Sequence, residues 1–242
     1  MSEKTSPDTV PGLGFKDKEK ALETLKVLEG RDPDYQKLAI KGLIGRAKRT
    51  LTLTKAEDKL QNIKDAMDVF ETWLQNYEKN NLAKENRPYL PLATLHVFKP
   101  LINKHKIQDQ KAKDFLSAYE SVNGDYKHLR TVSSGDDEPT WDIVRNKHLK
   151  KIFKSIEDDK PDMWKNDLPT EKHLELIMWA HSPDASKIKK NLSKIEELLE
   201  SENENSSDDE NHEETPKSSK SKRKSDSSRS SDDETPKKKN KK

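Results

Sequence analysis

The sequence predicts an all-α protein, an irregular bundle of about seven to nine helices followed by a disordered C-terminal tail. Apolar residues recur three and four positions apart through most of residues 15–201, and no segment shows sustained alternation of β-branched residues. Residues 202–242 contain no hydrophobic side chain, so this segment cannot bury a core. We therefore expect a flexible N-terminus over 1–14, a helical domain over 15–201 and a disordered tail over 202–242.

Three helices are predicted before residue 80. The first ends at Gly30, which accommodates a left-handed C-cap. The second begins with Asp32 as its N-cap and Pro33 at its first position, and Thr54 with Glu57 forms a capping box for the third. Their apolar faces are Phe15, Leu22, Leu25 and Leu28; Leu38, Ile40, Leu43, Ile44, Ala47 and Leu51; and Leu60, Ile63, Met67, Phe70, Leu74 and Tyr77.

The apolar face of the third helix alternates three and four residues apart from Leu60 to Tyr77. This spacing is typical of the central core helix of a bundle and also of a coiled-coil seam. Because sustained coiled coils usually extend over at least about three to four heptads, we favour the bundle helix and a monomer. A homodimeric coiled coil is the alternative.

The middle of the chain contains proline-separated pieces and one helix with clear ends. Prolines predict two short helical pieces or one kinked piece between Leu92 and His105. Asp109 is the expected N-cap of the following helix, which should stop at Asn123 and Gly124. The polar loop 133–139 is a candidate subdomain boundary. The prolines are Pro88, Pro91 and Pro100, and the helix carries Ala112, Phe115, Leu116, Tyr119 and Val122.

Three further helices are predicted between residues 140 and 201. One has an apolar face and a basic face, and a short one starting at Thr170 is apolar nearly all round, which indicates full burial. The last starts with Ser182, Pro183 and Asp184. Their apolar residues are Trp141, Val144, Leu149, Ile152 and Ile156; Leu174, Leu176, Ile177, Met178 and Trp179; and Ile188, Leu192, Ile195 and Leu199.

Composition excludes several classes of protein. The chain has no cysteine, which excludes disulfides and thiolate metal sites and favours a cytosolic or nuclear address. The N-terminus lacks the apolar core of a signal peptide, and no apolar run approaches the ~20 residues of a membrane span. No phosphate-binding loop, dinucleotide fingerprint, nucleophile elbow or zinc-protease helix is present. We therefore expect a non-enzymatic protein without cofactor or metal.

Three motifs have functional and structural interpretations, of which we favour the structural one. Residues 12–15 (GLGF) match a carboxylate-binding loop, but that loop needs a following strand and a helix is predicted here. Gly42 and Gly45 match a nucleic-acid-binding GxxG loop, but the apolar residues between them favour close helix packing. His173 and His181 lie eight residues apart beside an apolar cluster, which favours structural histidines over metal ligands.

A lysine stripe is the first feature that indicates a binding function. Four lysines at i, i+3, i+4 and i+7 share one face of the helix that begins near Trp141. Such a stripe can neutralise phosphates of a nucleic acid, with release of counterions. An ordinary solvated face with intrahelical pairs to Glu157 and Asp158 is the interpretation that we favour. The candidate nucleic-acid-binding residues are Lys147, Lys150, Lys151 and Lys154.

The tail is the second such feature. Residues 202–214 contain seven acidic and no basic residues, and residues 215–242 contain eleven basic and four acidic residues. Two basic clusters separated by twelve residues suit a bipartite nuclear import signal, which predicts a nuclear or nucleolar protein that meets an import receptor. The cluster residues are Lys220, Lys222, Arg223, Lys224, Lys237, Lys238, Lys239, Lys241 and Lys242.

The tail contains an imperfect repeat, SSDDENHEETPK and SSDDETPK. In each copy a serine is followed three residues later by an acidic residue, which is the spacing that acidophilic kinases accept. The candidate phosphorylation sites are Ser206, Ser207, Thr215, Ser230, Ser231 and Thr235. Together these features favour a nuclear helical scaffold or adaptor that has a phosphorylatable tail. We expect its partners to be nuclear proteins, with chromatin or RNA as candidate associates. The alternative is direct DNA or RNA binding through the lysine stripe and the tail. We expect no membrane association.

Overall fold

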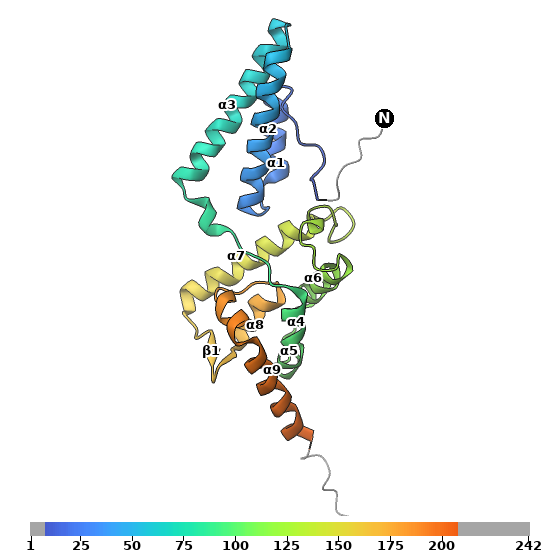
Figure 1. The fold of residues 1–242 in the computed structure, drawn as a ribbon, viewed down its shortest axis with the longest axis vertical. Coiled ribbons are helices and arrows are strands. Elements are labelled where there is room, and N and C mark those ends of the chain that lie inside the picture. The colour runs from blue at the N-terminus through green and yellow to red at the C-terminus, as the bar shows by residue number, and fades with distance from the viewer. Residues whose placement is uncertain (1–7, 208–242) are drawn as a thin grey trace, which may run out of the picture.

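The computed structural model describes residues 8–207, with side chains through Leu199. Within this range the chain forms nine α-helices, two short 3₁₀ helices and one minimal β-hairpin, which confirms the all-α prediction. The helices are arranged as two lobes, one above the other, and the molecule is elongated (Figure 1). None of the helices in this part of the chain combines the length and the hydrophobicity of a membrane span.

The N-terminal lobe consists of α1 (Lys18–Leu28), α2 (Pro33–Leu53) and α3 (Glu57–Lys79). Helix α3 packs along both α1 and α2, so its apolar face is the central face of a helical bundle, as predicted. Phe70 is fully buried at the middle of this core. The other buried members of the core cluster are Val10, Ala21, Leu28, Tyr35, Ile40, Leu43, Ile44 and Ala66.

The predicted helix ends in this lobe are partly confirmed. Gly30 has φ +78°, the left-handed conformation expected after α1. Asp32 occupies the N-cap position of α2, but its side chain makes no capping hydrogen bond. The capping box at Thr54 is wrong: Thr54 is the C-cap of α2, and its hydroxyl donates to the Thr50 carbonyl at 2.8 Å. With Thr54 bonded backward, α3 begins at Glu57 without a side-chain cap.

The C-terminal lobe contains the remaining α-helices, and the predicted starts of α6 and α8 agree with the structure. Two short helices replace one continuous helix after Leu92, and the carboxylate of Asp109 accepts the backbone N–H of Ala112 as the predicted cap. The 3₁₀ helix η1 (Leu82–Glu85) follows α3 and contacts α2 and α3. The elements of the C-terminal lobe are α4 (Leu92–Val97), α5 (Lys99–Lys104), α6 (Gln110–Ser121), η2 (His128–Arg130), α7 (Trp141–Asp159), β1 (Trp164–Lys165), β2 (Leu168–Pro169), α8 (Glu171–Met178) and α9 (Ala185–Ser207).

The core of this lobe is built around α8, which is apolar nearly all round as predicted. Trp179 is fully buried, with its ring 5.2 Å from that of Phe115. The same core cluster includes residues on both sides of loop 133–139. This loop therefore does not separate two cores, contrary to its interpretation as a subdomain boundary. The two cores separate between α3 and Leu90, where the chain passes from one lobe to the other.

Two differences concern residues 160–207. Strands β1 and β2 pair antiparallel through Asn166 and Asp167, both with positive φ, as in a type I′ turn. Two-residue strands are too short for any periodicity to show in the sequence. Helix α9 continues to Ser207, past the Ser201 at which we expected the helical domain to end.

Buried polar contacts join the two lobes. The Arg31 guanidinium, at the α1–α2 turn, pairs with Asp142 of α7 at 2.8 Å, and both side chains are almost fully buried. The Asn146 amide donates to the Gly30 carbonyl at 3.1 Å. Gly30 also approaches α7 closely, because a Cβ there would lie 3.2 Å from Ile143. We call Arg31, Asp32, Asp142, Arg145 and Asn146 the interlobe seam.

Candidate binding surfaces

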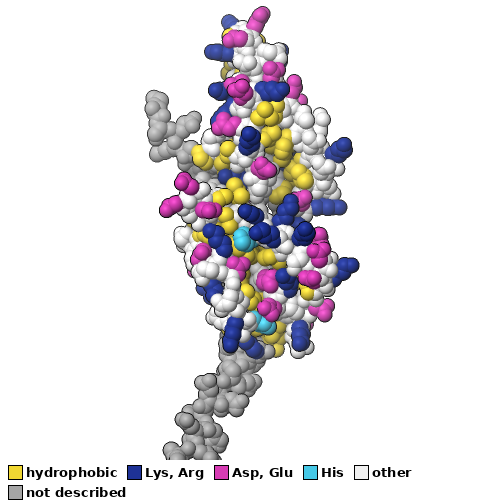
Figure 2. Space-filling model, turned by 180° about the vertical axis from the view of Figure 1, so that it is seen from behind, with side chains coloured by type: hydrophobic (Ala, Val, Ile, Leu, Met, Phe, Trp, Pro, Cys, Tyr) yellow, Lys and Arg dark blue, Asp and Glu magenta, His cyan; other side chains and the backbone are white. Residues whose placement is uncertain are grey.

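An open groove lies between α1 and α3 in the N-terminal lobe, with a volume of about 550 Å³. Its apolar lining consists of Leu22 and Leu25 from α1 and of Val69 and Trp73 from α3. Leu22 is 45% exposed. The polar lining consists of Lys18, Asp65, Asp68, Thr72 and Asn76. Figure 2 shows hydrophobic side chains exposed along this lobe on the face opposite to that of Figure 1.

The groove exists because the apolar arcs of α1 and α3 are wider than the contact between the helices. Ala21, Thr24 and Leu28 are buried on α1, whereas Leu22 and Leu25 lie to one side of that line. On α3 the buried residues include Ala66 and Phe70, and the groove residues Val69 and Trp73 lie beside them. Helical spacing places each flanking set on its own continuous stripe. The stripes face each other across the groove.

Two leucines that we predicted for core faces are exposed instead. Leu22 lies at the groove, and Leu38 of α2 is 70% exposed. Leu53, at the end of α2, is 82% exposed. Helical periodicity identifies an apolar arc but not the part of it that a neighbouring helix covers. Exposed single leucines are common, so only Leu22, within an apolar groove, indicates a binding surface.

The lysine stripe lies on the solvent side of α7. Lys147, Lys150, Lys151 and Lys154 are all exposed, while Leu149 and Arg145 of the same helix are buried. Over residues 8–199, none of the four lysines forms an ion pair within 4 Å, and neither Glu157 nor Asp158 pairs with them. The predicted intrahelical pairs are therefore not formed, and the ammonium groups are available to a ligand.

The imidazole of His148 lies on the same helix as the four lysines, and its pKa depends in part on two of them. Its ring stacks on Trp179 at 4.4 Å. Burial lowers the pKa of His148 below its ordinary value, and the ammonium groups of Lys151 and Lys147 lower it further. The neutral imidazole leaves the lysines as the source of positive charge at this surface.

The interlobe seam brings together four charged side chains that are largely buried, Arg31, Asp32, Asp142 and Arg145. Arg145 is fully buried; its guanidinium donates to the carbonyls of Trp179 and Arg87, both at 2.9 Å, and lies 3.5 Å from the ring centre of Tyr89. Asp32 accepts from Asn146 at 3.2 Å. Burial raises the pKa of the Asp32 carboxyl, although the Arg145 charge opposes this shift. These contacts fix the position of α7 relative to the α1–α2 turn, which is a structural role.

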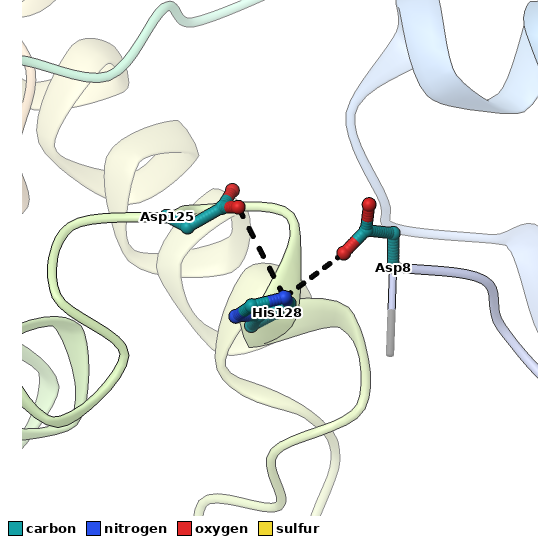
Figure 3. Close-up of side chains that lie close together, drawn as sticks. All are labelled: Asp8, Asp125 and His128. Carbon is teal, nitrogen blue, oxygen red and sulfur yellow. Dashed lines mark ion pairs between the residues drawn. The ribbon is translucent and has the colours of Figure 1, made fainter. Parts of the chain in front are cut away.

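A second polar contact between the lobes involves His128. Its Nε2 lies 3.0 Å from Asp8 Oδ1 and 3.9 Å from Asp125 Oδ2 (Figure 3). The three donor atoms lie within 4.8 Å of one another, a spacing that a divalent cation could also use. All three side chains are partly exposed, and the His128–Asp8 contact already joins the N-terminal segment to η2. We assign this cluster to the attachment of the N-terminal segment to the C-terminal lobe.

His173 and His181 are buried, as the structural interpretation expects. The His173 ring lies between the Met163 carbonyl at 3.0 Å and the Ser182 hydroxyl at 2.8 Å. His181 Nδ1 lies 3.0 Å from the Pro88 carbonyl. Burial lowers the pKa of both imidazoles, that of His181 to about 4. As neutral groups, His181 therefore holds the end of α8 against the segment before α4, and His173 holds α8 against Met163 and Ser182.

The glycine motifs have different outcomes. The GLGF segment precedes a helix, as predicted, and the Gly14 backbone exchanges hydrogen bonds with the Thr24 hydroxyl of α1. Gly42 and Gly45 do not allow close helix packing, because a Cβ at either position would meet nothing within 4 Å. That interpretation is wrong. Both glycines lie on the exposed face of α2, whereas Leu43 and Ile44, between them in the sequence, face the core.

The tail sites lie almost entirely outside the described residues. Ser206 and Ser207 are the last two residues of α9. The import-signal residues, Thr215, Ser230, Ser231 and Thr235 have no described position.

Neither the groove nor the interlobe seam was predicted from the sequence. Leu22 and Leu25 were assigned to the core, and Asp68 and Thr72 carry no motif. Arg31 and Asp142 are 111 residues apart, and no local pattern pairs them. The one available signal was the presence of Arg145 between Val144 and Leu149 on an otherwise apolar helix face.

No family model matches this sequence, and no curated protein is similar enough to count as a relative.

Proposed function

We propose that this chain is a non-enzymatic nuclear adaptor whose helical lobes present a partner-binding groove. The α1–α3 groove supports the proposal most directly. It exposes Leu22 beside a half-buried Trp73. A solvent-facing apolar surface next to polar rim residues is typical of a protein-binding site. The buried interlobe seam holds this groove on a defined support, as an adaptor requires.

Two exposed leucines allow a matched test of this function. The full-length chain is immobilised and incubated with nuclear extract, and retained proteins are identified by mass spectrometry. Leu22→Asp places a charge inside the groove, and Leu38→Asp places the same charge on an exposed leucine outside it. We expect Leu22→Asp to lose partners that the wild-type and Leu38→Asp chains retain, with both variants folded by circular dichroism. Equal partner sets for the three proteins would contradict the proposal.

Direct nucleic-acid binding through α7 is the second candidate function. It is supported by the exposure of Lys147, Lys150, Lys151 and Lys154 and by the lack of any ion pair to them within the described side chains. Each phosphate contact contributes a slope of about −0.9 to the dependence of log K on log salt for duplex DNA. Changing all four lysines to Gln should reduce that slope by up to about 3.6.

A charge-matched control makes this measurement specific. Lys55, Lys59, Lys64 and Lys79 are exposed on or beside α3, and their change to Gln removes the same charge from a different surface. Binding of full-length proteins to duplex DNA and to single-stranded RNA is measured over a range of salt concentrations. If the two four-site variants lose affinity equally, net charge and not the α7 surface accounts for binding.

The tail contains the proposed nuclear import signal. Its two basic clusters motivate a fluorescent-fusion experiment in which alanine replaces six cluster residues. We expect the wild-type fusion in the nucleus and the variant in the cytoplasm; nuclear accumulation of the variant would contradict the assignment. The residues changed are Lys222, Arg223, Lys224, Lys237, Lys238 and Lys239.

Phosphorylation of the tail is the proposed regulation. Residues 202–242 hold eleven basic and eleven acidic groups, and each phosphate adds about 1.5 to 2 negative charges. Four-site Ser→Glu substitution should therefore weaken binding to duplex DNA and strengthen binding to a basic peptide. Equal affinities for both ligands would show that the tail does not contact them. The sites are Ser206, Ser207, Ser230 and Ser231.

A further inference from the structure

The shape of the α1–α3 groove restricts the backbone of its ligand. The α3 side of the groove extends from Asp65 to Asn76, which is about 16 Å, or three helical turns, at 1.5 Å per residue. Both walls are helices whose backbone groups are bonded within the helix, so the groove offers no sheet edge to an extended peptide. A ligand that satisfies its own backbone hydrogen bonds in such a setting is a helix.

The apolar lining requires hydrophobic side chains from the ligand. Leu22, Leu25, Val69 and Trp73 form one continuous apolar surface, and burial of such surface is the main source of affinity in helix-in-groove complexes. Residues 202–242 of this chain contain no hydrophobic residue. The tail of the protein therefore cannot fill the groove, and the ligand belongs to another molecule.

The rim selects the charge of the ligand. The lining contains the two carboxylates of Asp65 and Asp68 and the single ammonium group of Lys18. Asp65 accepts a hydrogen bond from the Gln61 amide at 2.7 Å. Among residues 8–199, neither carboxylate has a cation within ion-pair distance. Along α3, Trp73 lies about 12 Å from Asp65 and about 7.5 Å from Asp68, so the negative charge is concentrated toward one end of the groove.

We propose that the groove binds a basic amphipathic helix of a partner protein. The ligand places apolar residues at i, i+4 and i+7 against Leu22, Val69 and Trp73, and a Lys or Arg at the end of that face that meets Asp65 and Asp68. This inference rests on the proposed adaptor function and adds the chemical class of the partner.

The test uses a displayed library of 14-residue helices with fixed apolar residues at i, i+4 and i+7 and random residues elsewhere. The library is selected against the full-length chain, and the affinities of enriched peptides are measured by fluorescence polarisation. We expect enrichment of Lys and Arg. Leu22→Asp should weaken binding about tenfold or more, and Asp65→Asn with Asp68→Asn about three- to tenfold. Leu38→Asp, outside the groove, should have no effect.

Reversing the charge of Asp65 and Asp68 tests directly whether these two residues select the charge of the ligand. Selection against the chain carrying Asp65→Lys and Asp68→Lys should enrich peptides rich in Glu and Asp, because the rim then has the opposite sign. A proline in the middle of an enriched peptide should abolish binding, since it breaks the helix.

The outcomes separate the two proposals. If binding depends on Leu22 but the enriched peptides have no charge preference or tolerate proline, the adaptor groove stands and its basic helical ligand is wrong. If no peptide binds in a Leu22-dependent manner, both proposals are overturned. A dimer of the chain alone, measured by sedimentation and dissolved by Leu22→Asp, would show that a second copy occupies the groove, which also overturns a basic helical partner.

Discussion

The two lobes cover the tryptophan that packs in or against their core to different extents. In the C-terminal lobe Trp179, Phe98 and Phe115 are fully buried, whereas in the N-terminal lobe Phe70 is buried and Trp73 stays half exposed beside an open groove. Apolar surface left in water contributes nothing to stability and is free to bind a partner. In the proposed adaptor function, the C-terminal lobe supports the molecule and the groove of the N-terminal lobe binds the partner.

Replacement of the central aromatic residue in the C-terminal lobe should have the largest effect. Trp179→Ala removes ring contacts to Phe115 and His148 and the hydrogen bond from the indole N–H to Asp109. We expect a loss of about 3 to 5 kcal/mol in the free energy of unfolding, as for other buried aromatic residues. Leu22→Ala in the groove should cost less than about 1 kcal/mol. Urea titrations followed by circular dichroism compare them, and equal losses would remove the distinction between the lobes.

Breaking the interlobe seam should have the next largest effect. Asp142→Asn leaves the buried Arg31 guanidinium without its carboxylate partner, and the free energy of unfolding should fall by about 3 kcal/mol. Combining Arg31→Met with Asp142→Leu removes both charges and should cost less than the two single changes together. The coupling is measured by a double-mutant cycle in urea. Additive losses would show that the lobes are held together by other contacts.

Acid should weaken the fold through His181. Its pKa is lowered to about 4, first by burial and then by the charges of Arg145 and Arg87, whereas an unfolded histidine titrates near 6.5. The unfolded state therefore takes up the proton first, and stability is lost as pH falls from about 6.5 to 4, by roughly 3 kcal/mol in total. The raised pKa of Asp32 acts in the opposite sense, because the folded state binds that proton more readily.

The measurement for this prediction is the melting temperature of the wild-type protein and of His181→Asn between pH 7 and 4. The asparagine amide can still donate to the Pro88 carbonyl but does not titrate. We expect a shallower acid dependence in the variant. Parallel curves would assign the acid sensitivity to other groups.

The smallest predicted effect is a stabilisation of the N-terminal lobe. Gly42→Ala and Gly45→Ala each add a methyl group that meets no atom within 4 Å, and each should stabilise α2 by about 0.5 to 1 kcal/mol. Gly30→Ala is the matched control and should destabilise, since Gly30 has φ +78° and a Cβ there would lie 3.2 Å from Ile143. A lower melting temperature for either α2 variant would indicate that these positions have a packing role.

Local patterns predicted most of the helices because their causes are local. Asp109 caps α6 and Gly30 follows α1 in the left-handed conformation, and both depend on residues within one turn. The Thr54 capping box failed because the same hydroxyl can bond backward to Thr50, and the sequence alone does not rank the two bonds. For the candidate surfaces, the Lys147 to Lys154 stripe was predicted from spacing, whereas the groove was not.

The sequence by itself determined the helical class, the apolar arcs and the basic face of α7, since periods of three and four residues fix which side chains share a face. Only the tertiary structure decided which part of each arc is covered. Leu22 and Leu28 belong to the same apolar set, yet one borders the groove and the other is buried. Burial depends on how a distant helix packs, and the Arg31–Asp142 pair joins residues 111 positions apart. No local pattern contains that information.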